Sequence, residues 1–488
     1  MAISFNQVPA DSRVPFFYAE FDASRAGATT VTFKSLLIGQ KLAAGTAAAN
    51  TLTKIGNAAA AITAFGRGSM LEHMVQAFRR QNPLGELWCI GLDDAGGAVA
   101  ATQTITVTAA ATAAGTIALY VAGRRVAVGV SSGAAVNTIA TAIRDAVNDD
   151  ADLPVQASVA AAVVTLTARH AGAATEIDLR LNHYPDEALP AGVALTIAAG
   201  TAGATDPAIA NALTAASIDK FDIIALPNYP SATITELVNE LDDRWEPTEQ
   251  IDGIGIMAYR GASGTVAQAT TYGDALNSPY LSVMDAGKMP NPGYEIAAAV
   301  AGAAALSASI DPARPFQTLE LKGLLAPAMA DRRAFADRNS MLQDGISTYY
   351  VDSGGAVRIE RLITTYQTNA SGAADTAYLN VNTPLTLSYI RTDFRQYITS
   401  KYPRHKLADD DTRIGPGQAV ITPKVGRAEA VSRFRDWETR GLVEGADQFK
   451  EDLVVERNAT DRDRLDWLLS PNLVNQFRIG GAKITFIL

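Results

Sequence analysis

The sequence predicts a multidomain α/β protein with a central, mostly parallel sheet that carries helices on both faces. Strand and helix patterns alternate in residues 23–98 and again in residues 206–345, as they do in parallel sheets. Between these stretches, residues 99–205 hold many short strands separated by turn signals, which is typical of a small β-rich domain inserted into a loop. The full predicted division is an N-terminal linking arm (1–22), a central domain (23–98 with 206–345), the inserted β-rich domain (99–205), an α+β C-terminal domain (346–478) and a C-terminal linking strand (479–488).

Length and composition indicate a globular chain. The 488 residues are enough for roughly two to four domains with a substantial core. No window approaches about 18 uninterrupted apolar residues, so we expect no membrane insertion. The N-terminus lacks a basic stretch followed by an apolar core, so we expect no secretory signal and a start in the cytosol. The single cysteine, Cys89, lies in an apolar run and is predicted to be a buried thiol.

The charge of the chain argues against a nucleic-acid partner. The net charge is −10, whereas nucleic-acid binders normally show a basic surplus or stripe. Residues 384–488 differ from the rest, because they hold 17 Lys and Arg against 15 Asp and Glu, while the whole chain holds 41 against 51. The C-terminal fifth is therefore the basic end of an acidic protein.

The N-terminal arm contains two strand-like patches that cannot bury a face locally. The first is centred on Ile3 and Phe5, and the second runs from Val14 to Tyr18. The apolar side chains of these patches are Ile3, Phe5, Val14, Phe16, Phe17 and Tyr18. We expect them to find partners elsewhere.

The first βαβ unit follows. Residues 31–39 and 86–92 are predicted strands, and residues 69–80 a helix. Ser69 is the predicted N-cap of that helix, with Glu72 completing a capping box.

The inserted domain is predicted from a run of short strands and one amphipathic helix, residues 135–149. The strands are expected at residues 104–109, 116–123, 125–130, 155–159, 163–168, 177–181 and 193–198.

The alternation of strand and helix resumes after residue 206. Strands are expected at 222–227, 253–260 and 280–285, and helices at 233–245, 265–276 and 294–308. Thr233 and Glu236 are the predicted capping box of the first of these helices.

The C-terminal part begins with a predicted hairpin, residues 348–365. It continues with helices at 383–402 and 426–442 and a strand at 451–458. The last residues, 483–488, are rich in β-formers and predict a terminal strand whose edge only Lys483 protects.

No motif in the sequence predicts catalysis, a cofactor or a metal. Gly253–Ala258 matches a loosened dinucleotide fingerprint, but those residues are themselves the strand. No phosphate-binding P-loop and no nucleophile elbow occur, and the four histidines are scattered. The acidic triplet Asp409–Asp411 lacks the spacing of a calcium loop and is predicted to be a solvated loop.

The arginines of the 426–442 helix allow two interpretations. Arg427, Arg433, Arg435 and Arg440 recur on it with acidic residues between them. They either pair with those acids on a solvated helix face or dock an acidic protein partner.

Four stretches together resemble the tail sheath proteins of Mu-like contractile bacteriophages. They are RVPFFYAEFD (13–22), the LPVQASV and VVTLTARHAGA segments of the inserted domain, LPNYP (226–230) and the C-terminal run WLLSPNLVNQFRIGGAKITFIL. The similarity extends over essentially the whole chain and rests on the ordered set of segments.

The resemblance implies a structural protein without cofactors. It implies a central domain of subtilisin-like fold without a catalytic triad, stacked hexameric rings around a tail tube, and contraction that drives the tube through the host envelope. Expected partners are further copies of the chain, the tail tube protein, and the baseplate and tail terminator proteins. The expected location is the virion tail, after assembly in the host cytoplasm.

The resemblance also assigns roles to individual residues. Strand exchange between subunits falls on the N-terminal patches and on Ile484, Phe486 and Leu488, and Arg427, Arg433, Arg435 and Arg440 are expected to face the tube. Two alternatives stay open: an α/β enzyme of hydrolase type with a β-rich accessory domain, and the sheath of a phage-derived bacteriocin or injection system. An enzyme should show a polar pocket at the carboxyl ends of the sheet strands.

Overall fold

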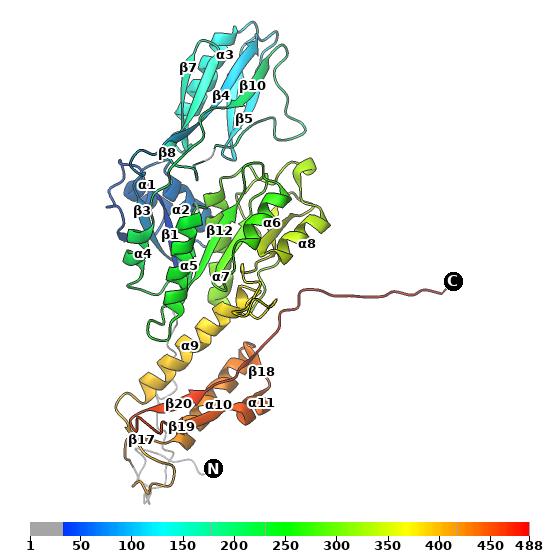
Figure 1. The fold of residues 1–488 in the computed structure, drawn as a ribbon. Coiled ribbons are helices and arrows are strands. Elements are labelled where there is room, and N and C mark those ends of the chain that lie inside the picture. The colour runs from blue at the N-terminus through cyan, green and yellow to red at the C-terminus, as the bar shows by residue number, and fades with distance from the viewer. Residues whose placement is uncertain (1–32, 176, 230, 416, 488) are drawn as a thin grey trace, which may run out of the picture.

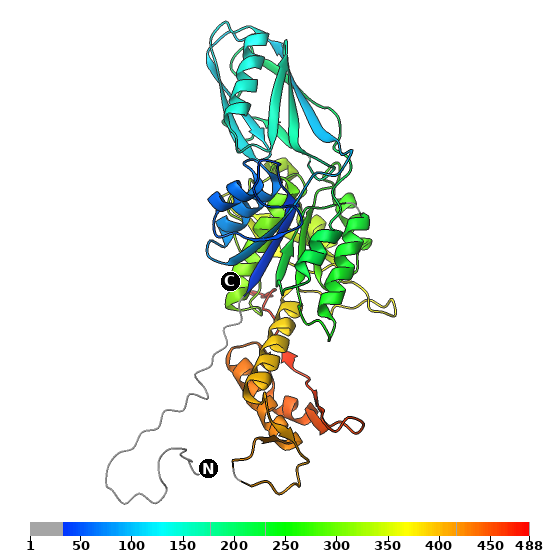
Figure 2. The ribbon, with the colours of Figure 1, turned by 90° about the vertical axis from the view of Figure 1, so that its left-hand side faces the viewer.

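The computed structural model describes residues 33–487 except 176, 230 and 416. The predictions on Ile3, Phe5, Val14, Phe16, Phe17, Tyr18 and Leu488 lie outside these described residues. The described chain is elongated, with the inserted β-rich part at one end, the large sheet in the middle and a smaller helical part at the other end (Figures 1 and 2).

An eight-stranded sheet forms the middle part, in the order β15-β14-β13-β12-β11-β1-β3-β2. Its strands are β1 (Lys34–Gln40), β2 (Leu52–Lys54), β3 (Glu86–Leu92), β11 (Ile223–Ala225), β12 (Ile254–Tyr259), β13 (Leu281–Asp285), β14 (Ile346–Val351) and β15 (Val357–Arg361). All neighbours are parallel except β2 with β3 and β14 with β15. The expected mostly parallel sheet is therefore present.

Helices cover both faces of this sheet, because its strands are apolar on both sides. In β1, Leu37 packs into one core while Leu36 and Ile38 pack into the other. The first core includes α1 (Ala58–Phe65), α2 (Met70–Gln81) and α7 (Gly293–Ile310), and the second includes α4 (Ala210–Ala216), α5 (Ser231–Trp245), α6 (Val266–Asp274) and one residue of α8 (Phe335–Gln343).

Helix α7 is long and apolar enough to cross a membrane by length and composition. However, 72% of it is buried inside the protein, against α2 and the sheet. Among the described residues it is the single helix of this kind, and its apolar character is accounted for by its place in the core.

The inserted part has a core of its own between two antiparallel sheets and a helix. One sheet contains β4 (Ala100–Ala109), β7 (Val155–Ala160), β8 (Val163–Ala171) and β10 (Ala194–Ala199), and the other contains β5 (Gly115–Val121), β6 (Arg124–Val130) and β9 (Leu179–Leu181). Helix α3 (Val136–Asp149) packs on both through Ile139, Ile143 and Val147. Every strand predicted for this stretch is present.

A long helix, α9 (Asn382–Lys401), leads away from the sheet and connects it to the C-terminal part (Figure 1). Around it lie α10 (Pro423–Thr439), α11 (Ala446–Asp452) and three two-stranded ladders. The ladders are β16 (Lys406–Leu407) with β17 (Val420–Ile421), β18 (Val443–Glu444) with β21 (Asn472–Leu473), and β19 (Val454–Arg457) with β20 (Leu465–Leu468). The hairpin of β14 and β15, which the sequence division placed with this C-terminal part, instead extends the central sheet through the β13–β14 ladder.

Several details differ from the sequence expectations. Ser69 caps α2 as predicted, but the Glu72 carboxylate accepts from the Gly68 N–H rather than from Ser69. Helix α5 begins at Ser231, so Thr233 lies inside it and the capping box predicted there is wrong. Helices α1, α4, α8 and α11 were not predicted, because each is short and lacks a clear apolar stripe.

Close packing of α2 against α7 gives a stability prediction. A Cβ on Gly302 would lie 2.7 Å from the Phe78 carbonyl oxygen, which is backbone and cannot move aside. We expect Gly302→Ala to lower the free energy of unfolding by about 1–3 kcal/mol, measured by chemical denaturation. Ser309→Ala, at an exposed position of the same helix, should leave it within about 0.5 kcal/mol. Equal stability of both variants would contradict the close contact.

Candidate assembly surface

The C-terminal segment leaves the folded body at Arg478. Upstream of that point, the Val474 N–H donates to the Leu442 carbonyl at 3.1 Å, and Gln317 Nε2 donates to the Phe477 carbonyl at 3.2 Å. Arg478 then donates to Asn382 Oδ1 at 3.0 Å. Beyond it, residues 479–487 make no hydrogen bond to the rest of the described chain and extend away from it (Figure 1).

Arg478 and Asn382 form the exit of this segment. Asn382 is fully buried and donates to the carbonyls of Pro312 and Arg314, which fixes its Oδ1 toward Arg478. Burial, with a smaller contribution from Arg361, lowers the pKa of Arg478 to about 10. The half-buried guanidinium remains charged near neutral pH, and its hydrogen bond to Asn382 holds the chain at this point. No local pattern in the sequence indicates this pair, since its partners are 96 residues apart.

The departing segment exposes large apolar side chains. Ile484 is 87% exposed, Phe486 78% and Ile487 99%. The strand predicted for residues 483–488 is absent among the described residues of this segment, because a strand needs a partner row of N–H and C=O groups and none lies alongside. The isolated chain therefore leaves an apolar, hydrogen-bonding ribbon uncovered.

The C-terminal ladders offer open edges of the kind that such a ribbon pairs with. Isolated two-stranded ladders are marginal in water, and a third strand completes them. In the β19–β20 ladder, the paired residues Val454 and Leu468 are 46% and 60% exposed.

Three of the four arginines of α10 are used inside the fold. Arg433 pairs with the buried Asp393 of α9 and, at 3.1 Å, with Asp436. Arg427 donates to the carbonyls of Lys450 and Leu453 in the α11 region.

The last of these three, Arg440, donates to the Tyr389 hydroxyl of α9. Arg435 differs from them, because its side chain is exposed. Together with Lys450, which has the larger effect, its charge lowers the pKa of Asp447. Pairing along one solvated helix face describes only the Arg433–Asp436 pair, since most of the contacts join the α10 region to other elements. Docking of an acidic partner stays a prediction.

A charged network fixes α10 to α9. Glu429 of α10 accepts from Lys401 Nζ at 2.7 Å and from the hydroxyls of Tyr397 and Tyr402. Burial would raise the pKa of Glu429, but these hydrogen bonds outweigh it and hold the pKa below its usual value. The two helices therefore form one rigid unit.

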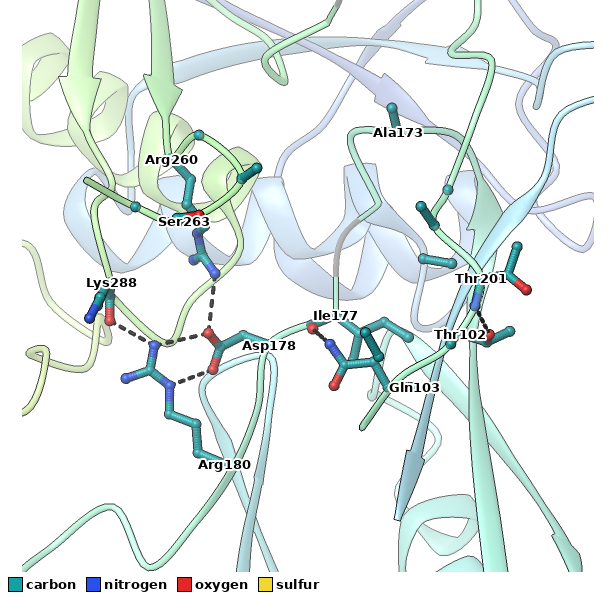
Figure 3. Close-up of a pocket in the computed structure, with 18 of the residues that line it drawn as sticks. Thr102, Gln103, Ala173, Ile177, Asp178, Arg180, Thr201, Arg260, Ser263 and Lys288 are labelled. Atoms are coloured by element: carbon teal, nitrogen blue, oxygen red, sulfur yellow. Dashed lines mark hydrogen bonds and ion pairs between the residues drawn. The ribbon is translucent and has the colours of Figure 1, made fainter. Parts of the chain in front are cut away.

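A cleft of about 590 Å³ lies between the inserted part and the carboxyl ends of β12 and β13 (Figure 3). It is the kind of polar pocket expected of the enzyme alternative. Among the described lining residues the carboxylate is Asp178, which is held by Arg180 at 2.6 Å and by Arg260 at 3.2 Å (Figure 3). No histidine or cysteine is among the lining residues, and the lining serine, Ser263, has no base beside it within the lining.

The other polar candidates of the sequence are placed in structural roles. Cys89 is fully buried, which raises the pKa of its thiol, so it is not a ready nucleophile. Asp409 pairs with Arg457 and Arg462, and Asp410 accepts from the Lys424 N–H at the start of α10. Among the described residues, no three His, Cys, Asp or Glu side chains gather in a way that could hold a metal ion.

Comparisons with known proteins agree with this picture of a structural, assembly-competent chain. The family model for the phage tail sheath protein central domain matches residues 202–365, and the model for the phage tail sheath C-terminal domain matches residues 373–486. The first match ends after the hairpin that extends the central sheet. The Mu-like prophage FluMu tail sheath protein of Haemophilus influenzae is 43% identical over 491 residues, covering all of both chains.

A solved structure shows the same fold at low sequence identity. The sheath tail protein of Listeria innocua superposes with a TM-score of 0.50 at 15% identity, over 93% of this chain and 94% of that one. The sheath tail protein of Desulfitobacterium hafniense gives 0.49 at 14% identity, over 95% and 100%.

The exposed terminal segment on a mixed α/β body, together with these matches, defines a structural protein of a contractile phage tail. The chain belongs to the phage tail sheath protein family.

The different surroundings of two α10 arginines give a stability prediction. Arg433→Ala removes the arginine that pairs with Asp393, a carboxylate that is 2% exposed. From α10, Asp393 then keeps the hydrogen bond of the Trp437 indole N–H, which carries no charge. We expect a loss of about 2–3 kcal/mol in the free energy of unfolding, because a buried carboxylate loses its counter-charge. Arg435→Ala, on the same helix, should change it by less than about 0.5 kcal/mol. Urea denaturation measures the free energy of unfolding of both variants. Equal losses in the two variants would contradict a structural role of Arg433 that Arg435 lacks.

Proposed function

We propose that copies of this chain polymerise as stacked hexameric rings around a tail tube, and that contraction of this array drives the tube through a host envelope. Membership of the sheath family supports the proposal. The single observation that carries it is the uncovered C-terminal ribbon, whose apolar side chains have no place to be buried within the described chain.

Strand addition to a neighbouring copy would complete this ribbon. About five cross-chain hydrogen bonds, at roughly 0.5–1.5 kcal/mol each, combine with burial of Ile484, Phe486 and Leu488, at roughly 1.5–3 kcal/mol each. The gross stabilisation is about 7–16 kcal/mol, much of which ordering and association costs offset. The open edges of the β19–β20 ladder suit the acceptor role, and the N-terminal patches at Ile3, Phe5 and Val14–Tyr18 would make a second link of the same kind.

Links of this type explain a tubular array that can rearrange. Residues 479–487 span up to about 30 Å when extended, enough to reach an adjacent body while the bodies move. Donor-to-acceptor contacts are heterologous, and heterologous contacts that do not close generate helices. Since each copy is joined at several points, release of one link is effectively intramolecular, and the lattice stays connected.

We assign the two ends of the elongated chain to the two surfaces of the sheath. The inserted domain, 99–205, would face outward and the C-terminal domain, with the basic surplus of the chain, would face the tube. The position of these parts at opposite ends of the long axis supports this assignment (Figure 1). Of the four arginines expected at the tube, Arg435 is the best suited, since Arg427, Arg433 and Arg440 are engaged within the fold.

The central body would be subtilisin-like in fold and serve as a scaffold without catalysis. Among the described residues that line its cleft, the carboxylate of Asp178 is neutralised by two arginines and the Lys288 ammonium is paired with Asp331. The ends of the array would be closed by baseplate and tail terminator proteins, with assembly in the host cytoplasm.

Substitutions on opposite faces of the C-terminal ribbon test the link. In an extended strand, Ile484 and Phe486 point to one side and Thr485 to the other. We expect Ile484→Lys with Phe486→Lys, and deletion of residues 484–488, to give folded subunits that form no tubes under negative-stain electron microscopy. Thr485→Lys, which adds charge to the other side, should polymerise. Normal tubes from the truncated chain would contradict the arm role.

The tube contact is tested at Arg435. We expect Arg435→Glu to leave subunit folding and polymerisation intact but to reduce co-assembly with purified tail tube protein, measured by co-sedimentation, because charge attraction is replaced by repulsion. Arg435→Lys should retain it. If the glutamate variant co-sediments with the tube protein as well as the unmodified chain does, Arg435 does not contribute to the tube contact.

A further inference from the structure

A cluster of buried polar groups joins the inserted part to the central body. Glu72 and His73 of α2 and Glu295 of α7 are 0%, 1% and 3% exposed. Across from them lie Asp152, in the turn between α3 and β7, and Arg124, at the start of β6. The cluster is distinct from the terminal ribbon and from the cleft, and the assembly role does not use it.

The backbones approach closely at this junction because two glycines face it. A Cβ on Gly68, which has φ +76°, would lie 2.9 Å from the Ala151 carbonyl oxygen. A Cβ on Gly123, with φ +78°, would lie 2.7 Å from Asn291 Nδ2. Larger residues at either position would hold the two parts of the chain apart and open the cluster to water.

The hydrogen bonds of His73 fix where its protons lie. His73 Nε2 is 2.6 Å from the Asp152 carbonyl oxygen, which can only accept, so Nε2 carries a proton. His73 Nδ1 is 3.3 Å from Glu295 Oε1, and both atoms are buried without any other hydrogen-bond partner. These two atoms can satisfy each other only if one proton lies between them.

The same proton count follows from the neighbouring charges. Glu295 Oε2 accepts from Asn291 Nδ2 at 3.1 Å, whereas Oε1 has the Arg124 guanidinium at 3.9 Å, which is beyond hydrogen-bond distance. Glu72 accepts from the Gly68 N–H and from Gln76, as an ionised carboxylate does. The positive charge of Arg124, 3.9 Å from Glu295, acts on both Glu295 and Glu72, but it can balance the charge of one carboxylate and not of two. One proton on the His73–Glu295 pair, on either atom, completes a neutral cluster.

We propose that His73 and Glu295 hold one shared proton, and that this proton locks the inserted domain onto the central body. His73 reaches Asp152 of the inserted part only when its Nδ1 side is satisfied by Glu295. Without the proton, a lone pair and a carboxylate oxygen face each other at 3.3 Å in a buried site, and the pair repels. The contact to Asp152 is then lost together with the close fit at Gly68.

The strength of the contact between the inserted domain and the central body is expected to be constant over a middle pH range and to fall above and below it. Burial raises the pKa of Glu295 above 4.5 and lowers the pKa of His73 from 6.5 to about 3. Between pH 4.5 and 6.5 the pair holds one proton whether the cluster is formed or not, since free histidine is then charged and free glutamate ionised. Above 6.5 the free pair loses its proton, whereas the formed pair needs one between His73 Nδ1 and Glu295 Oε1, so forming the contact takes up a proton and the lock weakens as pH rises.

Below pH 4.5 the free pair binds a second proton while the buried pair does not until about pH 3, so the lock weakens as pH falls.

Other charged or titratable groups act on the pair from every element around it. They are Glu72 and Arg80 of α2, Arg124 of β6, Asp152 with its partner Arg67, His170 of β8 and Tyr294 of α7.

Nitrogen NMR of the unmodified full-length chain tests the shared proton directly. The chain has four histidines, so selective ¹⁵N-histidine labelling and magic-angle spinning record four imidazoles in any state of assembly. We expect the His73 signals, assigned with His73→Gln, to stay constant from about pH 4.5 to 6.5 and to show a hydrogen-bonded Nδ1. His73 titrating alone near pH 6.5, or an Nδ1 without a hydrogen bond throughout, would overturn the proposal.

Hydrogen exchange tests the lock. In the full-length chain, protection of residues 66–79 and 150–155, corrected for intrinsic rates, should fall about tenfold per pH unit above about pH 6.5, where the free pair has lost its proton and the formed pair still holds one. Glu295→Gln keeps a donor for His73 and removes the titrating proton, so its protection should be independent of pH over the alkaline range. Glu236→Gln, an exposed change on α5, should behave as the unmodified chain. The same pH dependence in Glu295→Gln and the unmodified chain would contradict the assignment.

Discussion

The burial of six parallel strands between two layers of helices is the constraint on which the rest of the structure depends. Because β1, β11, β12, β13, β14 and β3 are apolar on both faces, neither helix layer can be removed without exposing the sheet. The layer with α2 and α7 is the tighter one, and the backbone contact at Gly302 allows it. Both the inserted part and helix α9 are attached to this body, so their positions are set by its rigidity.

The regular part of this architecture follows from local sequence patterns. Most strands of the sheet are short apolar runs, and Ser69 marks the start of α2, so these elements can be predicted nearly to the residue. The edge strand β2 is the exception, because its three residues LTK carry no strand pattern and the sequence does not predict it. The short helices α1 and α4 could not, because alanine-rich segments carry no apolar stripe that separates helix from loop. The hairpin of β14 and β15 was recognised, but its membership of the central sheet depends on pairing with β13, about 60 residues earlier, and no local pattern encodes that.

The polar features were harder to predict because they combine distant parts of the chain. Arg433 and Arg435 are equivalent in sequence, yet only the first finds the buried carboxylate of Asp393, 40 residues away. In the sequence His73 is one of four scattered histidines, and only the folded structure places Asp152 and Glu295 at its two ring nitrogens. The terminal segment differs again, since its apolar pattern was evident, while the conformation of a strand depends on a partner that the single chain does not contain.

Helix α9 has a mechanical consequence. Its first turns are fixed to the central body, where Arg391 pairs with the buried Asp252 at 2.8 Å and Lys220 donates to Ser388 and Thr392. Its last turns carry α10 through Glu429. From Thr392 to the helix end at Lys401, α9 rises about 14 Å, so a tilt of about 10° at this anchor would displace the far end by about 2 Å. The α10 region, fixed to that end, would move with it, so α9 would act as a lever arm between the central body and the C-terminal part.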